Sequence, residues 1–222
     1  MRTAHGTFSL AGHTVHRVDF APETFTDADL LWLPHHEKFS HAASKRKAEH
    51  LAGRIAAAHA LKAHGITAVP GTGSSGEPLW PAGFSGSISH TSRCALAVVA
   101  TNALTGIDCE IMLPAGEAEE IKDGIIGPDE EPLLRAAALP FALALTLAFS
   151  AKESLFKALY PAVGEMMGFD CARVTALDDE SLTLALTRPL AGFGEGFTFR
   201  LPWLREDTML IALLHSAPAA SR

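Results

Sequence analysis

Two long segments of the chain carry apolar residues at helical spacing, and each is followed by several short strand candidates. In residues 44–64 the apolar side chains recur every three or four positions, and Gly65 supplies a stop signal. A second helix is predicted over residues 140–160, ended by Pro161. Helices followed by small antiparallel sheets are typical of α+β proteins, so the sequence predicts an α+β fold with two similar halves.

Short strands are predicted where apolar and polar residues alternate, and glycine-rich or acidic segments separate them. Residues 70–86 are predicted to form a loop, and residues 178–180 a hairpin turn. The predicted strands are 13–20, 87–90, 94–101, 106–111, 172–177, 181–187, 196–201 and 209–215. Residues 114–127 mix acids with glycines and are the predicted boundary, which gives halves of residues 1–113 and 114–222.

The composition is that of a globular protein, with 48% hydrophobic residues. The chain of 222 residues has 18 Lys and Arg against 25 Asp and Glu, a net charge of −7 that argues against a general nucleic-acid binder. The N-terminus lacks a signal-peptide core, and the most apolar stretch, 136–149, is too short to span a membrane. Cys94, Cys109 and Cys171 show no CxxC spacing, so we expect a cytoplasmic protein without a disulfide framework.

Asp108 and Glu110 lie two residues apart on a predicted strand, so both carboxylates leave the same face. They are either solvated acids at a strand end or part of a Mg²⁺ site, since Mg²⁺ prefers oxygen ligands beside a phosphorylated substrate. Glu153 would supply a third carboxylate from the helix over residues 140–160.

On that helix, Thr146, Ser150, Glu153 and Lys157 form one polar stripe. Glu153 and Lys157 are spaced i,i+4, so a surface ion pair is the plainest interpretation of these two residues alone. The second acidic group at Asp108 and Glu110 favours a functional interpretation instead.

Basic residues are concentrated in the first long helix. Lys45, Arg46, Lys47 and Arg54 form either a solvated face or a phosphate-binding cluster, and Arg46 and Arg54 nearly share one face. Farther along the chain, glycine and hydroxyl residues lead into His90 at a strand end, where an anion has room to approach closely.

Taken together, these motifs resemble the 4′-phosphopantetheinyl transferases, and more closely the monomeric Sfp-type enzymes in the subgroup of enterobactin-synthase components. The resemblance spans about residues 37–160 and rests on ordered segments: Glu49-His50-Leu51-Ala52-Gly53-Arg54, Trp80-Pro81, Gly86-Ser87-Ile88-Ser89-His90, Gly106-Ile107-Asp108-Cys109-Glu110 and Phe149-Ser150-Ala151-Lys152-Glu153-Ser154-Leu155-Phe156-Lys157. It implies two α+β halves related by a pseudo-twofold axis, with a ligand cleft between them. It also implies transfer of the phosphopantetheine arm of coenzyme A to a serine of an acyl or peptidyl carrier protein, with Mg²⁺ and release of adenosine 3′,5′-bisphosphate.

The resemblance also implies residue roles. Asp108, Glu110 and Glu153, with the main-chain carbonyl of Cys109 nearby, would hold Mg²⁺. Glu153 would be the general base and Lys157 would stabilise the departing phosphate, so Asp108, Glu153 and Lys157 are the predicted catalytic residues. The residues predicted to bind coenzyme A are Arg46, Arg54, Gly73, Ser74, Ser75, Ser89, His90, Asp108, Glu153 and Lys157.

The glycine-rich segment departs from the family pattern, because Ser74 and Ser75 stand where many relatives carry a basic residue. Backbone amides and hydroxyls would then have to cradle the phosphate. This departure leaves open the alternative of a coenzyme A-binding module that has lost catalysis. A third alternative is a structural α+β protein whose charges are all solvated.

Overall fold

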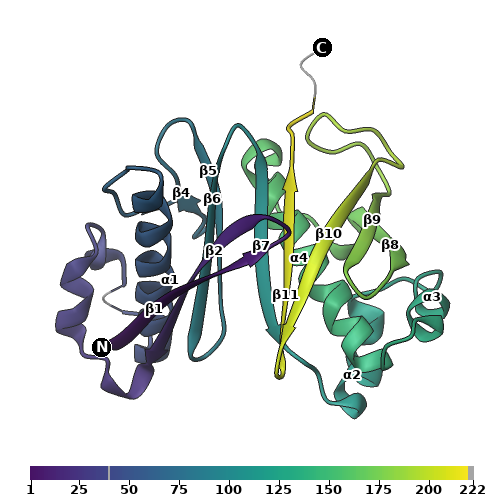
Figure 1. Ribbon diagram of the computed structural model, residues 1–222, viewed down its shortest axis with the longest axis horizontal. Helices are drawn as coiled ribbons and strands as arrows, with labels where there is room; N and C mark the ends of the chain where they lie inside the picture. The colour runs from purple at the N-terminus through teal and green to yellow at the C-terminus, as the bar shows by residue number, and fades with distance from the viewer. Residues whose placement is uncertain (40, 220–222) are drawn as a thin grey trace. The chain divides into compact units, whose positions relative to one another are not determined.

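The computed structural model describes residues 1–39 and 41–219, which form two compact units, Met1–Asn102 (unit 1) and Ala103–Arg222 (unit 2) (Figure 1). The α+β class is confirmed, since each unit packs a long helix against an antiparallel sheet. The predicted boundary after residue 113 is displaced, because the strand β7 (Leu104–Ile111) pairs with β11 (Met209–Ser216) and therefore belongs to unit 2.

Unit 1 is built on a four-stranded antiparallel sheet in the order β1-β2-β6-β5. Its strands are β1 (Arg2–Leu10), β2 (His13–Ala21), β5 (Phe84–His90) and β6 (Cys94–Thr101). The sequence predicted the last three but not β1, whose side chains are mostly exposed and which pairs along its whole length with β2. The predicted loop over residues 70–86 contains a short hairpin of β3 (Gly71–Thr72) and β4 (Pro78–Leu79).

The helix α1 (Ser44–Ala63) covers this sheet and contacts β2, β5 and β6 (Figure 1). Its buried face is made of small residues, including Ala48, Ala52 and Ala56, which allow the helix to approach the strands closely. Three short 3₁₀ helices precede it: η1 (Pro22–Thr24), η2 (Asp27–Trp32) and η3 (His36–Phe39).

Unit 2 contains a five-stranded antiparallel sheet in the order β7-β11-β10-β9-β8. The remaining strands are β8 (Ala172–Leu177), β9 (Ser181–Leu186) and β10 (Thr198–Glu206). Its helices are α2 (Ala115–Ile121), α3 (Glu131–Ala136) and α4 (Phe141–Val163), with 3₁₀ turns η4 (Lys122–Gly124) and η5 (Phe169–Cys171). Across residues 1–39 and 41–219, no helix is both long and apolar enough to cross a membrane.

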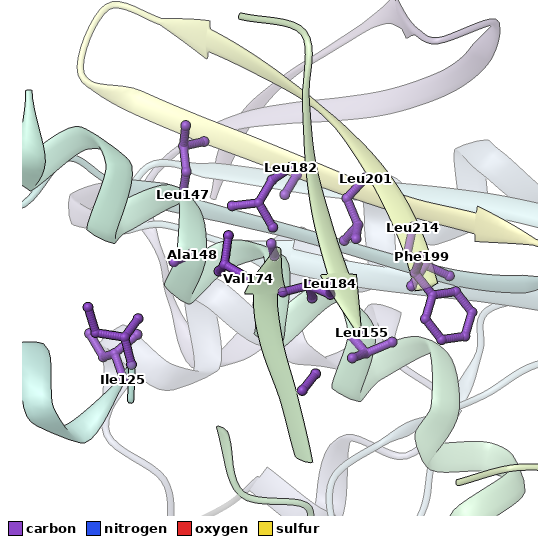
Figure 2. Packing of buried hydrophobic residues seen from close by; sticks show 14 of the residues in the cluster. Ile125, Leu147, Ala148, Leu155, Val174, Leu182, Leu184, Phe199, Leu201 and Leu214 are labelled. Atoms are coloured by element: carbon purple, nitrogen blue, oxygen red, sulfur yellow. The ribbon is translucent and has the colours of Figure 1, made fainter. Parts of the chain in front are cut away.

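The core of unit 2 lies between α4 and the sheet. Figure 2 shows Leu147 and Leu155 of α4 among side chains of the strands, such as Leu184 of β9 and Leu201 of β10. Burying each such side chain contributes roughly 2 kcal/mol by removing apolar surface from water. The core therefore fixes α4, and with it the polar side chains that α4 turns toward β7.

The helix α4 continues beyond the predicted stop at Pro161, so that prediction was wrong by one turn. Proline lacks one backbone donor, but near a helix end this loss removes only one internal hydrogen bond. The helix ends at Gly164, which adopts a left-handed conformation (φ 74°) and donates its N–H to the carbonyl of Tyr160 at 2.8 Å.

A glycine sets the closest approach between α4 and β7. A Cβ atom added at Gly106 would overlap the carbonyl oxygen of Ser154 on α4. Gly106 therefore lets the helix backbone lie directly against the strand, where any larger residue pushes the two apart.

We predict that Gly106→Ala destabilises unit 2 by about 3 kcal/mol or prevents its folding, because overpacking at a backbone contact has no side chain that can yield. Gly116→Ala on α2 is the matched control: nothing lies within 4 Å of its added Cβ. This control should be neutral or slightly stabilising. Urea unfolding of both variants tests the prediction, and equal midpoints would refute it.

Three imidazoles stack at one side of unit 1. The His5 and His59 rings lie 3.7 Å apart between centroids and are nearly parallel, and His5 Nε2 lies 3.1 Å from His16 Nδ1. Burial lowers the pKa of His16 to about 4, and the charges of His5, His59 and His64 contribute to the same shift. His16 is therefore neutral in the folded protein at neutral pH.

The unfolded chain binds a proton at His16 near pH 6.5, and the folded chain does so only near pH 4, so stability falls as the pH falls through this window. We predict that the free energy of unfolding of His16→Gln falls by about 2 kcal/mol less than that of the wild type between pH 7 and pH 4.5. Urea unfolding at both pH values measures this difference. The free energy of unfolding of the exposed His41→Gln variant should change with pH as that of the wild type does. If the free energy of unfolding of His16→Gln fell as much as that of the wild type, the prediction would be wrong.

Candidate functional site

The strand β7 presents two carboxylates from one face. Asp108 pairs across the ladder with Ala212 and Glu110 with Leu210, so the intervening Cys109 side chain leaves the opposite face. Asp108 is 3% exposed, whereas Glu110 is half-buried. A carboxylate as deeply buried as Asp108 requires a compensating charge.

Lys157 of α4 supplies that charge. Its Nζ donates to Asp108 Oδ1 at 2.7 Å and to the main-chain carbonyl of Ile107 at 3.2 Å. Burial by itself would lower the pKa of Lys157, but Asp108, together with Cys109 and Glu153, raises it above its ordinary value. Lys157 is therefore a firmly charged ammonium group held beside Asp108.

Glu153, one turn before Lys157, shares this region. Burial raises the pKa of Glu153, Asp108 raises it further, and Lys157 opposes the change. Burial likewise raises the pKa of Glu110 to about 7, with Asp108 and Glu153 adding to the rise and Lys157 opposing it. Three carboxylates thus repel one another around one ammonium group, an arrangement that attracts a further cation.

The chemistry of the donors fits Mg²⁺, although the protein does not form a complete cage by itself. Among the described residues, no three side chains of His, Cys, Asp or Glu converge tightly enough to hold a metal ion. Asp108, Glu110 and Glu153 nevertheless offer hard oxygen donors on neighbouring elements, and Mg²⁺ commonly uses one or two carboxylates completed by water and substrate phosphates. These residues therefore suit a cation that arrives with a phosphorylated ligand.

A buried ion pair that the sequence did not predict fixes α4 beside Glu153. The Lys152 Nζ lies 2.8 Å from Glu130 Oε1 and donates to the carbonyl of Ile125 at 2.9 Å. Glu130 also accepts the backbone N–H groups of Gly127 and Val174, each at 2.7 Å. This network ties the middle of α4 to β8 and to the loop before α3, so Glu153 projects from a well-anchored turn.

A small cavity of about 30 Å³ lies next to Glu153. It is mainly apolar, with Phe156, Met167 and Phe169 among its lining residues, and Lys152 contributes a polar edge. Because the cavity is mainly apolar, the Glu153 carboxyl group is partly shielded from water, which agrees with its raised pKa.

In unit 1, positive charge gathers around His50 of α1. Burial, together with the charges of Arg54, His35, Arg46 and His90, lowers the pKa of His50 to about 3. The predicted nucleotide-binding residues Arg46, Arg54 and His90 therefore each lie within electrostatic range of His50.

Arg46 and Arg54 differ in their surroundings. Arg46 is exposed and, among the described residues, forms no ion pair or hydrogen bond. Arg54 is 4% exposed, and its Nη2 donates to the carbonyl of Gly71 at 3.0 Å and to Thr72 Oγ1 at 2.9 Å. Burial, with Arg46 contributing, lowers the pKa of Arg54 to about 10. Arg54 therefore anchors the hairpin of β3 and β4.

The glycine-rich turn of this hairpin is closed by its own acidic residue. The backbone N–H of Ser75 donates to Glu77 Oε2 at 2.9 Å, and the N–H of Gly73 donates to the Glu77 carbonyl at 2.8 Å. Ser74 and Ser75 are exposed. The Ser75 amide predicted to meet a phosphate is thus engaged with the Glu77 carboxylate.

At the end of β5, Ser89 and His90 are adjacent in the strand, so their side chains leave opposite faces. Ser89 is buried and His90 is partly exposed. Glu49, which the sequence analysis did not single out, places Oε2 3.9 Å from His90 Nδ1 and Oε1 3.9 Å from Lys45 Nζ. Its i,i+4 spacing from Lys45 is visible in the sequence, but its proximity to His90 is not.

Comparison with known families matches both units. The model of the 4′-phosphopantetheinyl transferase N-terminal domain matches residues 35–100, and the model of the 4′-phosphopantetheinyl transferase superfamily matches residues 105–201. The first match lies within unit 1 and the second within unit 2, in agreement with the division of the structure.

Individual relatives agree. The chain is 47% identical to enterobactin synthase component D of Salmonella typhimurium, over 96% of this chain and 91% of the relative. It is 52% identical to enterobactin synthase component D of Escherichia coli O157:H7 over 71% of this chain and 76% of the relative. The 4′-phosphopantetheinyl transferase Svp of Streptomyces mobaraensis is 34% identical over 89% of this chain and 85% of its own length. The chain therefore belongs to the 4′-phosphopantetheinyl transferase superfamily.

Proposed function

We propose that this protein transfers the 4′-phosphopantetheine arm of coenzyme A to a serine of an acyl or peptidyl carrier protein. The observation that carries the proposal is the grouping of Asp108, Glu110, Glu153 and Lys157 on β7 and α4, within the segment matched by the superfamily model. The name of the enterobactin synthase relatives favours the carrier domain of a siderophore synthase as the acceptor.

In the proposed reaction the carrier serine Oγ attacks the phosphorus that bears the pantetheine group. A new P–O bond forms, the bridging P–O bond of the diphosphate breaks, and adenosine 3′,5′-bisphosphate leaves. Glu153 accepts the serine proton directly or through a water, and its raised pKa makes it a better base near neutral pH than an ordinary carboxylate.

Lys157 supplies fixed positive charge where negative charge grows on the departing phosphate. Asp108 and Glu110, with Glu153, would hold Mg²⁺, which neutralises diphosphate charge when bound. In this assignment Asp108 has two partners: Lys157 without ligand, and the cation when the nucleotide is present.

Unit 1 would hold the nucleotide part of coenzyme A. We assign the 3′-phosphate to Arg46 and His90, with Arg54 acting chiefly by holding the hairpin that carries Gly73, Ser74 and Ser75. The exposed Arg46 guanidinium has the forked geometry that suits phosphate oxygens.

We further propose that the protein acts as a monomer in the cytoplasm. Cys94, Cys109 and Cys171 are free and buried, as suits a reducing compartment.

Nothing in the comparisons favours the alternative of a catalytically impaired coenzyme A-binding module. Incubation with coenzyme A, Mg²⁺ and an apo-carrier domain separates the possibilities. Transfer adds the mass of the arm to the carrier, whereas an impaired module binds coenzyme A without this gain. A purely structural protein neither binds nor transfers.

We predict that Glu153→Gln lowers the turnover of arm transfer about 100-fold or more, because the amide cannot accept the serine proton. Without Mg²⁺, coenzyme A should still bind to this variant within a few-fold of the wild-type affinity. The measurement is the rate of mass gain of the carrier at saturating coenzyme A. The exposed Glu120→Gln on α2 removes an equal charge and should retain full turnover. A wild-type rate in Glu153→Gln would exclude this residue as the base.

We predict that Arg46→Ala raises the KM for coenzyme A about tenfold and leaves kcat within twofold, since it removes a contact to the ground-state ligand. With 3′-dephospho-coenzyme A the two proteins should have the same KM. Lys62→Ala, which removes an exposed positive charge from the far end of α1, serves as the control. If Arg46→Ala raised the KM equally for coenzyme A and for 3′-dephospho-coenzyme A, Arg46 would not be a contact of the 3′-phosphate.

A further inference from the structure

The helix α1 packs against the strand β5, and two pairs of residues meet along the packed faces: Gly53 with Ile88, and Glu49 with His90. A Cβ atom at Gly53 would lie 2.8 Å from Cγ2 of Ile88, so the helix and strand meet closely there. Glu49 lies one helical turn before Gly53, and His90 lies two residues after Ile88 on the same face of the strand. The packing that joins Gly53 to Ile88 thus brings Glu49 against His90, where Oε2 lies 3.9 Å from Nδ1.

Other charged groups surround this pair. Lys45 lies 3.9 Å from the second oxygen of Glu49, but its side chain is 73% exposed and well hydrated. Arg46, Arg54, His35 and His90 each lie within electrostatic range of His50, the residue after Glu49 on α1. Among these described groups, the carboxylate of Glu49 is the one that favours a positive charge on His90.

We propose that Glu49 is a positioning residue of the nucleotide site, which orients the His90 imidazole and keeps it in the protonated form that attracts a phosphate. This inference rests on the proposed function of His90 as a contact of coenzyme A. The Glu49 carboxylate lies within ion-pair distance of Nδ1, a ring nitrogen where acidic partners of functional histidines are found.

The direction in which Glu49→Gln changes phosphate binding distinguishes a role that acts through His90 from mere proximity to the phosphate. A carboxylate that only stands near an anion site repels the ligand, so its neutralisation strengthens phosphate binding. A carboxylate that acts through His90 has the opposite effect, because its loss lowers the pKa of His90 and leaves a neutral ring at pH 7.5. Glu49→Gln therefore weakens binding only if the proposal holds.

The test begins with the unliganded protein. The pKa of His90 is measured by NMR of histidine-labelled protein, with its signal assigned through His90→Gln. Glu49→Gln should lower this pKa by about one, as expected for the loss of an opposite charge at such a distance. The exposed Glu37→Gln should leave it unchanged.

Calorimetric titration with adenosine 3′,5′-bisphosphate then measures the ligand effect without Mg²⁺ or carrier. At pH 7.5 Glu49→Gln should bind about fivefold more weakly than the wild type, and at pH 5.5 the difference should fall below twofold. Glu49→Asp should recover most of the affinity, which also covers the case in which Glu49→Gln fails to fold. In a His90→Gln background, Glu49→Gln should cause no weakening.

Two failures are distinguishable. If the wild type binds the bisphosphate and Glu49→Gln binds equally or more tightly at pH 7.5, this inference is overturned while the proposed function stands. If the wild type does not bind the bisphosphate at all, the proposed function of unit 1 fails and the inference fails with it. An unchanged pKa of His90 in Glu49→Gln would overturn the inference in either case.

Discussion

The direct packing of α4 on β7 is the constraint on which the chemistry of unit 2 depends. Gly106 allows the helix backbone to meet the strand, and one turn farther along the helix Lys157 reaches Asp108 at 2.7 Å. The apolar side of α4 is fixed in the core, and the buried Lys152–Glu130 pair fixes the turn that carries Glu153. Three carboxylates and one ammonium group are thereby held on rigid elements instead of loops.

This arrangement has an electrostatic cost that a ligand relieves. Burial and mutual repulsion raise the pKa values of Glu110 and Glu153, so the unliganded protein holds its acids in an unfavourable state. A divalent cation delivered with a diphosphate would neutralise them and release Lys157 to the phosphate. In unit 1, Arg46 and His90 each lie within electrostatic range of His50, and Arg54 is hydrogen-bonded to the hairpin.

Local patterns predicted much of the fold. The strand β6 and the start of α1 have the predicted bounds, because alternation and helical spacing are properties of short segments. The boundary between the units was misplaced, since the membership of β7 depends on pairing with β11, which is about a hundred residues away along the chain. Sequence spacing identified Asp108 and Lys157 as candidates.

Contacts that depend on tertiary packing were not predictable in this way. The proximity of Glu49 to His90 follows from how α1 crosses β5, and the engagement of Ser75 by Glu77 follows from the conformation of a turn. The sequence predicted Arg54 as a coenzyme A contact, whereas in the structure its guanidinium is hydrogen-bonded to a hairpin. The partners lie seventeen and eighteen residues away, in a segment that the sequence presented as an open loop.

The most direct test of this account is the affinity for coenzyme A measured by calorimetry with and without Mg²⁺. If the acids on β7 and α4 bind a cation together with the diphosphate, Mg²⁺ should tighten binding by at least about tenfold. Asp108→Asn should lose this gain while it keeps the affinity measured without metal. Equal affinities with and without Mg²⁺ in the wild type would contradict the account.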